Sequence, residues 1–142
     1  MSIIGFRGPY RFLSNFHPTP NLSLLSYRWP TAEHAYQAMK TEDVVAQSHI
    51  CRAKTPGEAK RLGRCVAMRS GWLEMRLNVM RLVVDFKFQD PTLRALLLET
   101  ANIQLVEWNV WQDTFWGVCR GIGENNLGKI LMETRQKIRE GT

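Results

Sequence analysis

The chain has 142 residues, of which 44% are hydrophobic and 23% charged, a composition that predicts one globular domain over residues 1–142 and argues against a second. Nineteen Lys and Arg against thirteen Asp and Glu leave a formal charge of +6, which favours anionic partners such as phosphorylated metabolites or nucleic acid. The three cysteines form no CxxC pair, which argues against a disulfide framework or a Cys-rich zinc site and indicates a reducing cytoplasm. No apolar run reaches the about 18 residues of a membrane span, so no membrane partner is expected.

The N-terminal part predicts two short strands around a long loop. Ser2–Phe6 and Ser23–Tyr27 are brief runs bounded by Gly, Pro and Asn, and GPYRFLSNFHPTPN lies between them. Pro30 and Thr31 then open a short helix, since Pro is tolerated in a first turn.

The middle of the chain predicts two helices. Thr55 and Glu58 match a capping box with Pro56 between them, which indicates a helix from Pro56 to about Arg64. The stretch Ser70–Phe88 predicts a long amphipathic helix, because its apolar residues recur at helical spacing: Leu73, Leu77, Met80, Val84 and Phe88.

The C-terminal part predicts two more helices and a strand. Asp90 caps a helix that begins at Pro91, Ile103–Trp108 alternates like a strand, and Leu127–Arg139 is helical after a glycine-dotted loop. The expected fold class is therefore α+β, predominantly helical, with a small sheet of short strands.

The segment WPTAEHAYQAMK, from Trp29 to Lys40, places four polar side chains on one helical face. Glu33, Tyr36, Gln37 and Lys40 follow the spacing i, i+3, i+4 and i+7. A solvent-exposed face with a contact between Glu33 and Gln37 is the ordinary interpretation. The adjoining Trp-Pro and the cost of exposing Tyr36 favour the wall of a cleft instead, with Lys40 as a phosphate anchor.

His34 beside Glu33 does not complete a metal site. The HExxH motif needs a second histidine four residues on, where this chain has Ala38. His17 and His49 add no ligand spacing, so no metal and no organic cofactor is expected.

Asp113 lies among large aromatic side chains in WNVWQDTFWG. The carboxylate can cap a turn inside a hydrophobic plug, a common role for Asp. Alternatively, the aromatic residues next to it can grip a planar heterocycle. The sequence leaves both interpretations open.

Basic residues cluster between these two segments. A solvated helix face is the default interpretation, with a specific anion site as the alternative. GIGENNLGK lacks the ending of a phosphate-binding Walker loop. The members of the cluster are Arg52, Lys54, Lys60, Arg61, Arg64 and Arg69.

Several stretches, in order along nearly the whole chain, together resemble the NADAR superfamily. The most specific combination is W-P-T-x-E-H, D-x-F/Y-W-G and N-x-L-G. The stretches are FLSNF, WPTAEHAYQAMK, AKRLGR, WLEMRLNVM, DTFWG and NNLGKILMETR.

The resemblance implies a single compact domain with N-glycosidase activity, hydrolysing the bond between a base nitrogen and carbon 1 of ribose. In one branch of the family it implies ribosylamino-pyrimidine 5'-phosphates, early riboflavin-pathway intermediates, as substrates. Other branches are linked to NAD and ADP-ribose chemistry, including removal of ADP-ribose from guanine.

Position by position, the resemblance places the family's acidic residue on Glu33, its long-helix tryptophan on Trp72 and its D-x-F/Y-W pair on Asp113 and Trp116. Glu33 and Asp113 are the expected catalytic residues, because carboxylates near carbon 1 stabilise an oxocarbenium-like sugar and activate water. Which of the two is the base stays open. The expected substrate-binding residues are Trp72, Trp116, Lys40, Tyr36, Asn15, Arg7, Lys60 and Arg64, of which Lys40, Lys60, Arg64 and Arg7 would hold the phosphate.

Three functions remain in competition. The first is hydrolysis of a phosphorylated ribosyl metabolite, with no evident protein partner. The second is removal of ADP-ribose from guanine in nucleic acid, where the positive charge would track the backbone. The third is a non-catalytic module that binds ADP-ribose or a nucleotide, which the presence of both Glu33 and Asp113 argues against.

Overall fold

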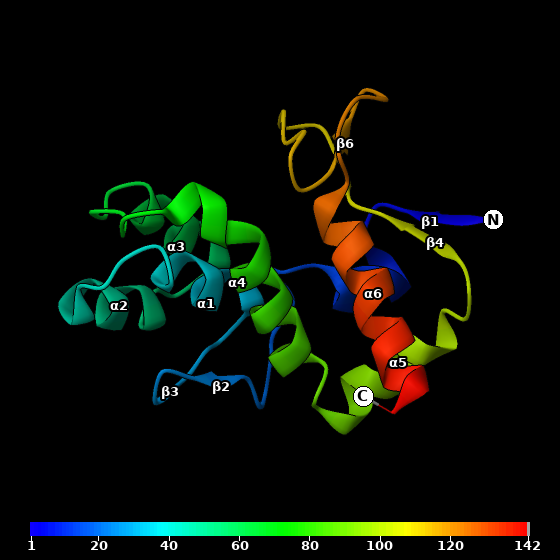
Figure 1. Cartoon of the computed structure of the whole chain (residues 1–142), viewed down its shortest axis with the longest axis horizontal. Helices are drawn as coiled ribbons and strands as arrows, with labels where there is room; N and C mark the ends of the chain where they lie inside the picture. Colours follow the sequence, from blue (N-terminus) through cyan, green and yellow to red (C-terminus); the bar gives the residue numbers. More distant parts are fainter. Residues whose placement is uncertain (142) are drawn as a thin grey trace. The chain divides into compact units, whose positions relative to one another are not determined.

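The computed structural model describes residues 1–141, and the chain forms two compact units (Figure 1). The terminal unit joins Met1–Ser14 to the segment that begins at Pro91, and the central unit is Asn15–Asp90.

The terminal unit packs helices against a two-stranded parallel sheet. Strand β1 (Ser2–Ile4) pairs with β4 (Gln104–Val106), so that Ile3 lies opposite Leu105, and both side chains are buried. The two strands lie side by side in Figure 1, and β4 contacts helix α6 (Asn126–Glu140).

The rest of the terminal unit consists of short elements around this sheet. A 3-10 helix, η1 (Gly8–Leu13), packs against α5 (Pro91–Glu99). Strand β5 (Trp108–Asn109) pairs in parallel with β6 (Val118–Cys119).

The NNLG sequence, at residues 125–128, holds the start of α6 against β4. Asn125 has a left-handed backbone (φ 54°), its Oδ1 accepts the Glu107 N–H at 2.9 Å and its Nδ2 donates to the Leu105 carbonyl at 2.9 Å. A side chain at Gly128 would overlap the Leu105 carbonyl. The NNLG sequence is therefore explained by packing.

The central unit surrounds helix α1 (Ala32–Ala38) with three other helices. These are α2 (Val44–Cys51), α3 (Pro56–Gly63) and α4 (Trp72–Lys87), and each of them contacts α1. The alanines of α1 are fully buried, which lets its neighbours approach closely.

A hairpin precedes α1. Strands β2 (Ser23–Leu24) and β3 (Tyr27–Arg28) are antiparallel, and the two residues between them, Leu25 and Ser26, both have positive φ. This is the backbone of a tight two-residue turn, normally formed by Asn or Gly.

The predicted fold class is confirmed: the structure is α+β and predominantly helical with short strands. The predicted helices over residues 56–64, 70–88, from 91, and over 127–139 correspond to α3, α4, α5 and α6. None of the described helices combines the length and apolar character needed to cross a membrane.

Several sequence predictions were wrong in detail. Residues 23–27 form a hairpin rather than one strand, η1 lies in the predicted loop, and α2 was not predicted. Residues 103–108 divide into β4 and β5, while the loop that follows contains β6. Leu73, one of the apolar residues whose helical spacing predicted α4, is 65% exposed.

Candidate active site

The polar stripe of α1 is buried rather than solvated. Glu33, Tyr36 and Gln37 are 8%, 5% and 3% exposed. The interpretation of this face as solvent-exposed is therefore wrong, because α2, α3 and α4 pack around this short helix.

Glu33 is held through both its side chain and its backbone. Its Oε2 accepts a hydrogen bond from Gln37 Nε2 at 2.5 Å, and its N–H donates to the Asn15 carbonyl at 3.0 Å. Asn15 is buried, its Nδ2 contacts Met80 Sδ at 3.4 Å, and its Oδ1 has no hydrogen-bond partner within residues 1–141. Asn15, whose backbone carbonyl accepts the Glu33 N–H, therefore also has a buried side-chain oxygen that accepts no hydrogen bond from the described residues.

Two aromatic rings extend the site along α1. The rings of Tyr36 and Trp72 lie 5.4 Å apart at an interplanar angle of 54°, and Trp72, the first residue of α4, is 4% exposed. The Lys40 Nζ lies 5.9 Å from the centre of the Tyr36 ring.

Lys40 is the centre of a charged group. Burial lowers the pKa of the Lys40 ammonium, Glu33 opposes that effect, and the positive charges of Lys60 and Arg64 lower it further. Lys40 therefore interacts electrostatically with the Glu33 carboxylate and with the cations of Lys60 and Arg64, all within the central unit. Lys60 is half-buried and Arg64 is exposed.

Arg69 anchors the end of α1, a function that the sequence did not reveal. Its N–H donates to the Lys40 carbonyl at 2.7 Å, its Nε to the Met39 carbonyl at 2.8 Å and its Nη2 to the Thr41 carbonyl at 3.0 Å. Arg69 was expected only as a member of the basic cluster. No local pattern could identify it, because its partners are about 30 residues away.

In the terminal unit, Asp113 caps the turn that carries DTFWG. Its Oδ1 accepts the N–H groups of Phe115 at 3.2 Å and Trp116 at 2.9 Å, which confirms the turn-cap interpretation. Asn109, another residue that sequence analysis missed, supports the same turn. Its Oδ1 accepts the Asp113 N–H at 3.1 Å, and its Nδ2 donates to the Asp113 carbonyl at 2.8 Å.

Two other expected binding residues belong to the terminal unit. Trp116 is half-buried and packs edge-on against Phe115, with ring centres 4.7 Å apart. Arg7 is exposed, and its guanidinium lies 5.9 Å from the centre of the Trp108 ring.

The structure therefore assigns the ten expected site residues to two groups. The central unit contains Asn15, Glu33, Tyr36, Lys40, Lys60, Arg64 and Trp72, and the terminal unit contains Arg7, Asp113 and Trp116.

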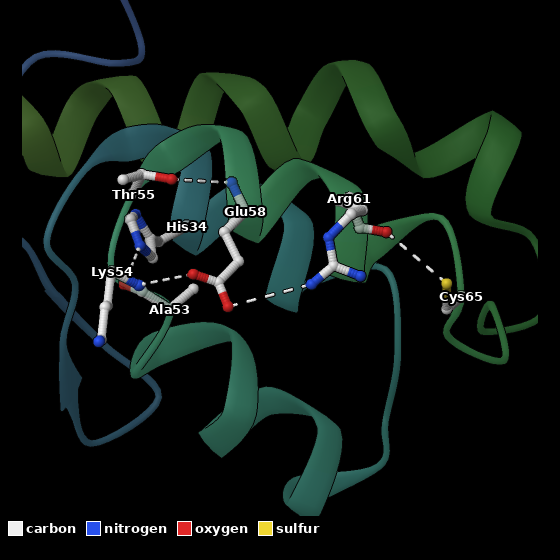
Figure 2. A network of polar contacts seen from close by, with 7 residues as sticks. All are labelled: His34, Ala53, Lys54, Thr55, Glu58, Arg61 and Cys65. Atoms are coloured by element: carbon white, nitrogen blue, oxygen red, sulfur yellow. Dashed lines mark hydrogen bonds and ion pairs between the residues drawn. The ribbon is translucent and has the colours of Figure 1, made fainter.

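His34 is a structural residue. Its Nε2 lies 3.0 Å from the Ala53 carbonyl, which can only accept, so Nε2 carries the hydrogen and Nδ1 accepts from the Thr31 hydroxyl at 2.8 Å. Figure 2 shows His34 directed at Ala53, just before α3 begins. Among the described residues, no three His, Cys, Asp or Glu side chains gather as a metal ion would require.

Figure 2 also shows the capping box of α3. The Thr55 hydroxyl accepts the Glu58 N–H at 3.1 Å, as predicted. In turn, the Glu58 carboxylate accepts the N–H of Lys54, the residue before the cap, at 3.2 Å.

We expect the protein to lose stability as the pH falls below about 6.5, the ordinary pKa of histidine. Burial lowers the pKa of His34 in the folded state, so the unfolded chain takes up the proton first and unfolding becomes more favourable. Urea unfolding at pH 7.5 and pH 5.5 measures this. The difference between the two midpoints should shrink in His34→Gln, and an unchanged difference would contradict the assignment.

Comparison with known proteins shows the family of this chain. The NADAR domain family model matches residues 5–139. The N-glycosidase YbiA of Escherichia coli (strain K12) is 39% identical over 133 residues, covering 91% of this chain and 82% of that protein. An N-glycosidase of Nostoc punctiforme is 39% identical over 138 residues, covering 92% and 87%.

A longer relative and a solved structure match as well. A riboflavin biosynthesis protein of Vibrio vulnificus is 39% identical over 133 residues, and the chain spans only 36% of its length. The NMR structure of E. coli YbiA superposes with a TM-score of 0.86 at 37% identity, covering 99% of this chain and 86% of that one. The chain belongs to the NADAR domain family, and its relatives in E. coli and Nostoc punctiforme are named N-glycosidases.

Proposed function

We propose that this N-glycosidase hydrolyses the bond between the exocyclic nitrogen and ribose carbon 1 of a ribosylamino-pyrimidine 5'-phosphate. The observation that carries the proposal is the buried Glu33 carboxylate in the same charged group as Lys40, Lys60 and Arg64. That combination suits a phosphorylated sugar: one anion for the positive charge that develops on the ring, and cations for the phosphate. The name of the Vibrio relative supports the riboflavin-type substrate.

In the proposed reaction, water supplies the oxygen that bonds to carbon 1 while the bond from carbon 1 to nitrogen breaks. A carboxylate accepts one proton from the water and passes it on to the departing nitrogen, so the carboxylate is regenerated and the products are the free amine and ribose 5-phosphate. Glu33 is proposed as a catalytic residue because a buried carboxylate stabilises an oxocarbenium-like sugar more strongly than a hydrated one. Asp113 is proposed as the second catalytic carboxylate, and either one can be the base.

The substrate-binding residues of the central unit have separate proposed roles. Lys40, Lys60 and Arg64 bind the phosphate. The packed rings of Tyr36 and Trp72 form an apolar wall. Asn15 offers its unpartnered Oδ1 to a hydroxyl or amine of the substrate.

In the terminal unit, Trp116 is proposed to stack on a ring of the substrate, and Arg7 to contribute to phosphate binding. Trp116 is positioned for this by the turn that Asp113 caps. Half-buried tryptophans combine a large apolar face with access to a ligand.

A second candidate is removal of ADP-ribose from guanine in nucleic acid. The observation in its favour is the set of exposed cations near α3, namely Arg52, Lys54 and Arg61, which have no role in the first proposal. Binding to a nucleic-acid backbone would weaken steeply with salt, whereas binding of a small phosphorylated metabolite would respond less.

The deciding experiment is chromatography of products after separate incubation with three compounds. They are a ribosylamino-pyrimidine 5'-phosphate, free ADP-ribose, and DNA that carries ADP-ribosylated guanine. We expect free pyrimidine and ribose 5-phosphate from the first alone. Restored guanine and released ADP-ribose from the third would favour the nucleic-acid function, and no product from any of the three would favour a binding module.

A further inference from the structure

Gln37 is a buried residue whose side-chain amide contacts the Glu33 carboxylate. It lies one helical turn after Glu33, and its Nε2 donates to Glu33 Oε2 at 2.5 Å. Because the acceptor is a carboxylate and the site is buried, this is a charge-assisted hydrogen bond with little competition from water.

Helix α3 confines the same amide group from the other side. A Cβ atom at Gly63 would overlap Oε1 of Gln37 and lie only 2.7 Å from its Cδ. Gly63 is itself buried. The Gln37 amide therefore occupies space that any larger residue at position 63 would remove.

This arrangement leaves Gln37 Oε1 buried without a hydrogen-bond partner in the described part of the chain. A buried carbonyl without a hydrogen bond is energetically unfavourable, a cost that an apolar side chain would avoid. Within the described residues, the hydrogen bond of this amide is the one from Nε2 to the Glu33 carboxylate. The amide nitrogen is thus directed toward the carboxylate, while the amide oxygen has no hydrogen bond among the described residues.

We propose that Gln37 is a positioning residue for the Glu33 carboxylate and that Gly63 makes room for it. The bond to Oε2 restricts rotation of the carboxylate plane, so that the group meets the substrate in one orientation. This inference rests on the proposed catalytic role of Glu33.

The first test is Gln37→Met, which keeps the length of the side chain but removes the amide. Because misplacement of a catalytic group by about 1 Å can cost on the order of 100-fold in rate, we expect kcat to fall by that order while KM changes little. Kinetics are measured on whichever of the three compounds the wild-type protein cleaves.

Gln47→Met is the matched control. Gln47 is also buried in the central unit, and its Nε2 donates to the Thr41 carbonyl at 2.8 Å rather than to a carboxylate. The control variant should lose stability but keep kcat. Equal loss of kcat in both variants would overturn the proposal.

A second variant approaches the same contact from α3. Gly63→Ala introduces a methyl group into the space of the Gln37 amide, so it should lower kcat as Gln37→Met does. If a folded Gly63→Ala protein kept full kcat, the role assigned to Gly63 would be wrong.

The hydrogen bond between Gln37 and Glu33 is also tested without a substrate. In NMR spectra the side-chain amide protons of Gln37 should shift upfield in Glu33→Gln, because the charged acceptor is lost, while those of Gln47 should stay unchanged. An unmoved Gln37 signal would overturn the proposal. Inactivity of the wild-type protein on the pyrimidine phosphate, with the Gln37 shift present, would instead contradict the proposed substrate.

Discussion

Glu33→Gln is expected to lower kcat by about 100- to 10,000-fold, the range associated with loss of a catalytic acid or base. The substitution preserves the size of the side chain and its hydrogen-bonding ability, so the fold around α1 should persist. It removes the negative charge that the proposed mechanism places near carbon 1. The measurement is the steady-state rate of ribose 5-phosphate release, with the far-UV circular dichroism spectrum and thermal midpoint as checks on folding.

Glu42→Gln provides the control for this prediction. Glu42 is exposed in the connection between α1 and α2, so its substitution makes the same change in net charge without altering the buried site. Its kcat should match that of the wild type. A folded Glu33→Gln protein with the rate of Glu42→Gln would remove Glu33 from the proposed chemistry.

Lys40→Met is expected to raise KM for the phosphorylated substrate by about 10- to 100-fold. A hydrogen bond to a charged partner contributes about 1.5–3 kcal/mol, and about 1.4 kcal/mol corresponds to a factor of ten. Methionine retains most of the apolar stem of lysine, so the main loss is the ammonium, which lies 5.9 Å from the centre of the Tyr36 ring. The measurement compares KM and kcat for wild type and variant at pH 7.5.

Lys54→Met is the matched control, because Lys54 is exposed and only its backbone N–H takes part in the network shown in Figure 2. Its KM should stay near that of the wild type. A loss of kcat in Lys40→Met without a change in KM would assign Lys40 to the reacting atoms instead of the phosphate.

The lowered pKa of Lys40 adds a dependence on pH to this prediction. Because burial, Lys60 and Arg64 all favour the neutral amine, Lys40 loses its proton at lower pH than an ordinary lysine. The proposed phosphate contact should therefore weaken on the alkaline side, as a rise in wild-type KM that Lys40→Met lacks.

Elements with a local cause were predictable. The cap of α3 depends on Thr55 and Glu58, three residues apart, and α6 follows from apolar periodicity over a long run. Helix α2 was missed because its first residues, Val44 and Val45, are 67% and 60% exposed, so its sequence lacks a regular apolar face. The turn at Leu25 and Ser26 was missed because neither residue is typical of left-handed backbone.

The site residues divide in the same way, into features with a local cause and features that depend on packing. Glu33, Tyr36 and Lys40 were predicted to share a face from helical spacing alone, since that spacing is local. Their burial was not predictable, because it depends on helices packed around α1. The amide of Gln37 against Gly63 also joins separate segments, so no pattern within either segment indicates the contact.

The sequence by itself determined the family, the helical character of the fold and the polar stripe of α1. Each of these depends on neighbouring residues or on motifs that can be matched along the chain. Only the tertiary structure decided that the stripe is buried, that Arg69 holds the end of α1, that Asp113 caps its turn, and that the Gln37 amide packs against Gly63. Burial and unsatisfied hydrogen bonds are properties of packed segments, and the order of residues alone does not specify them.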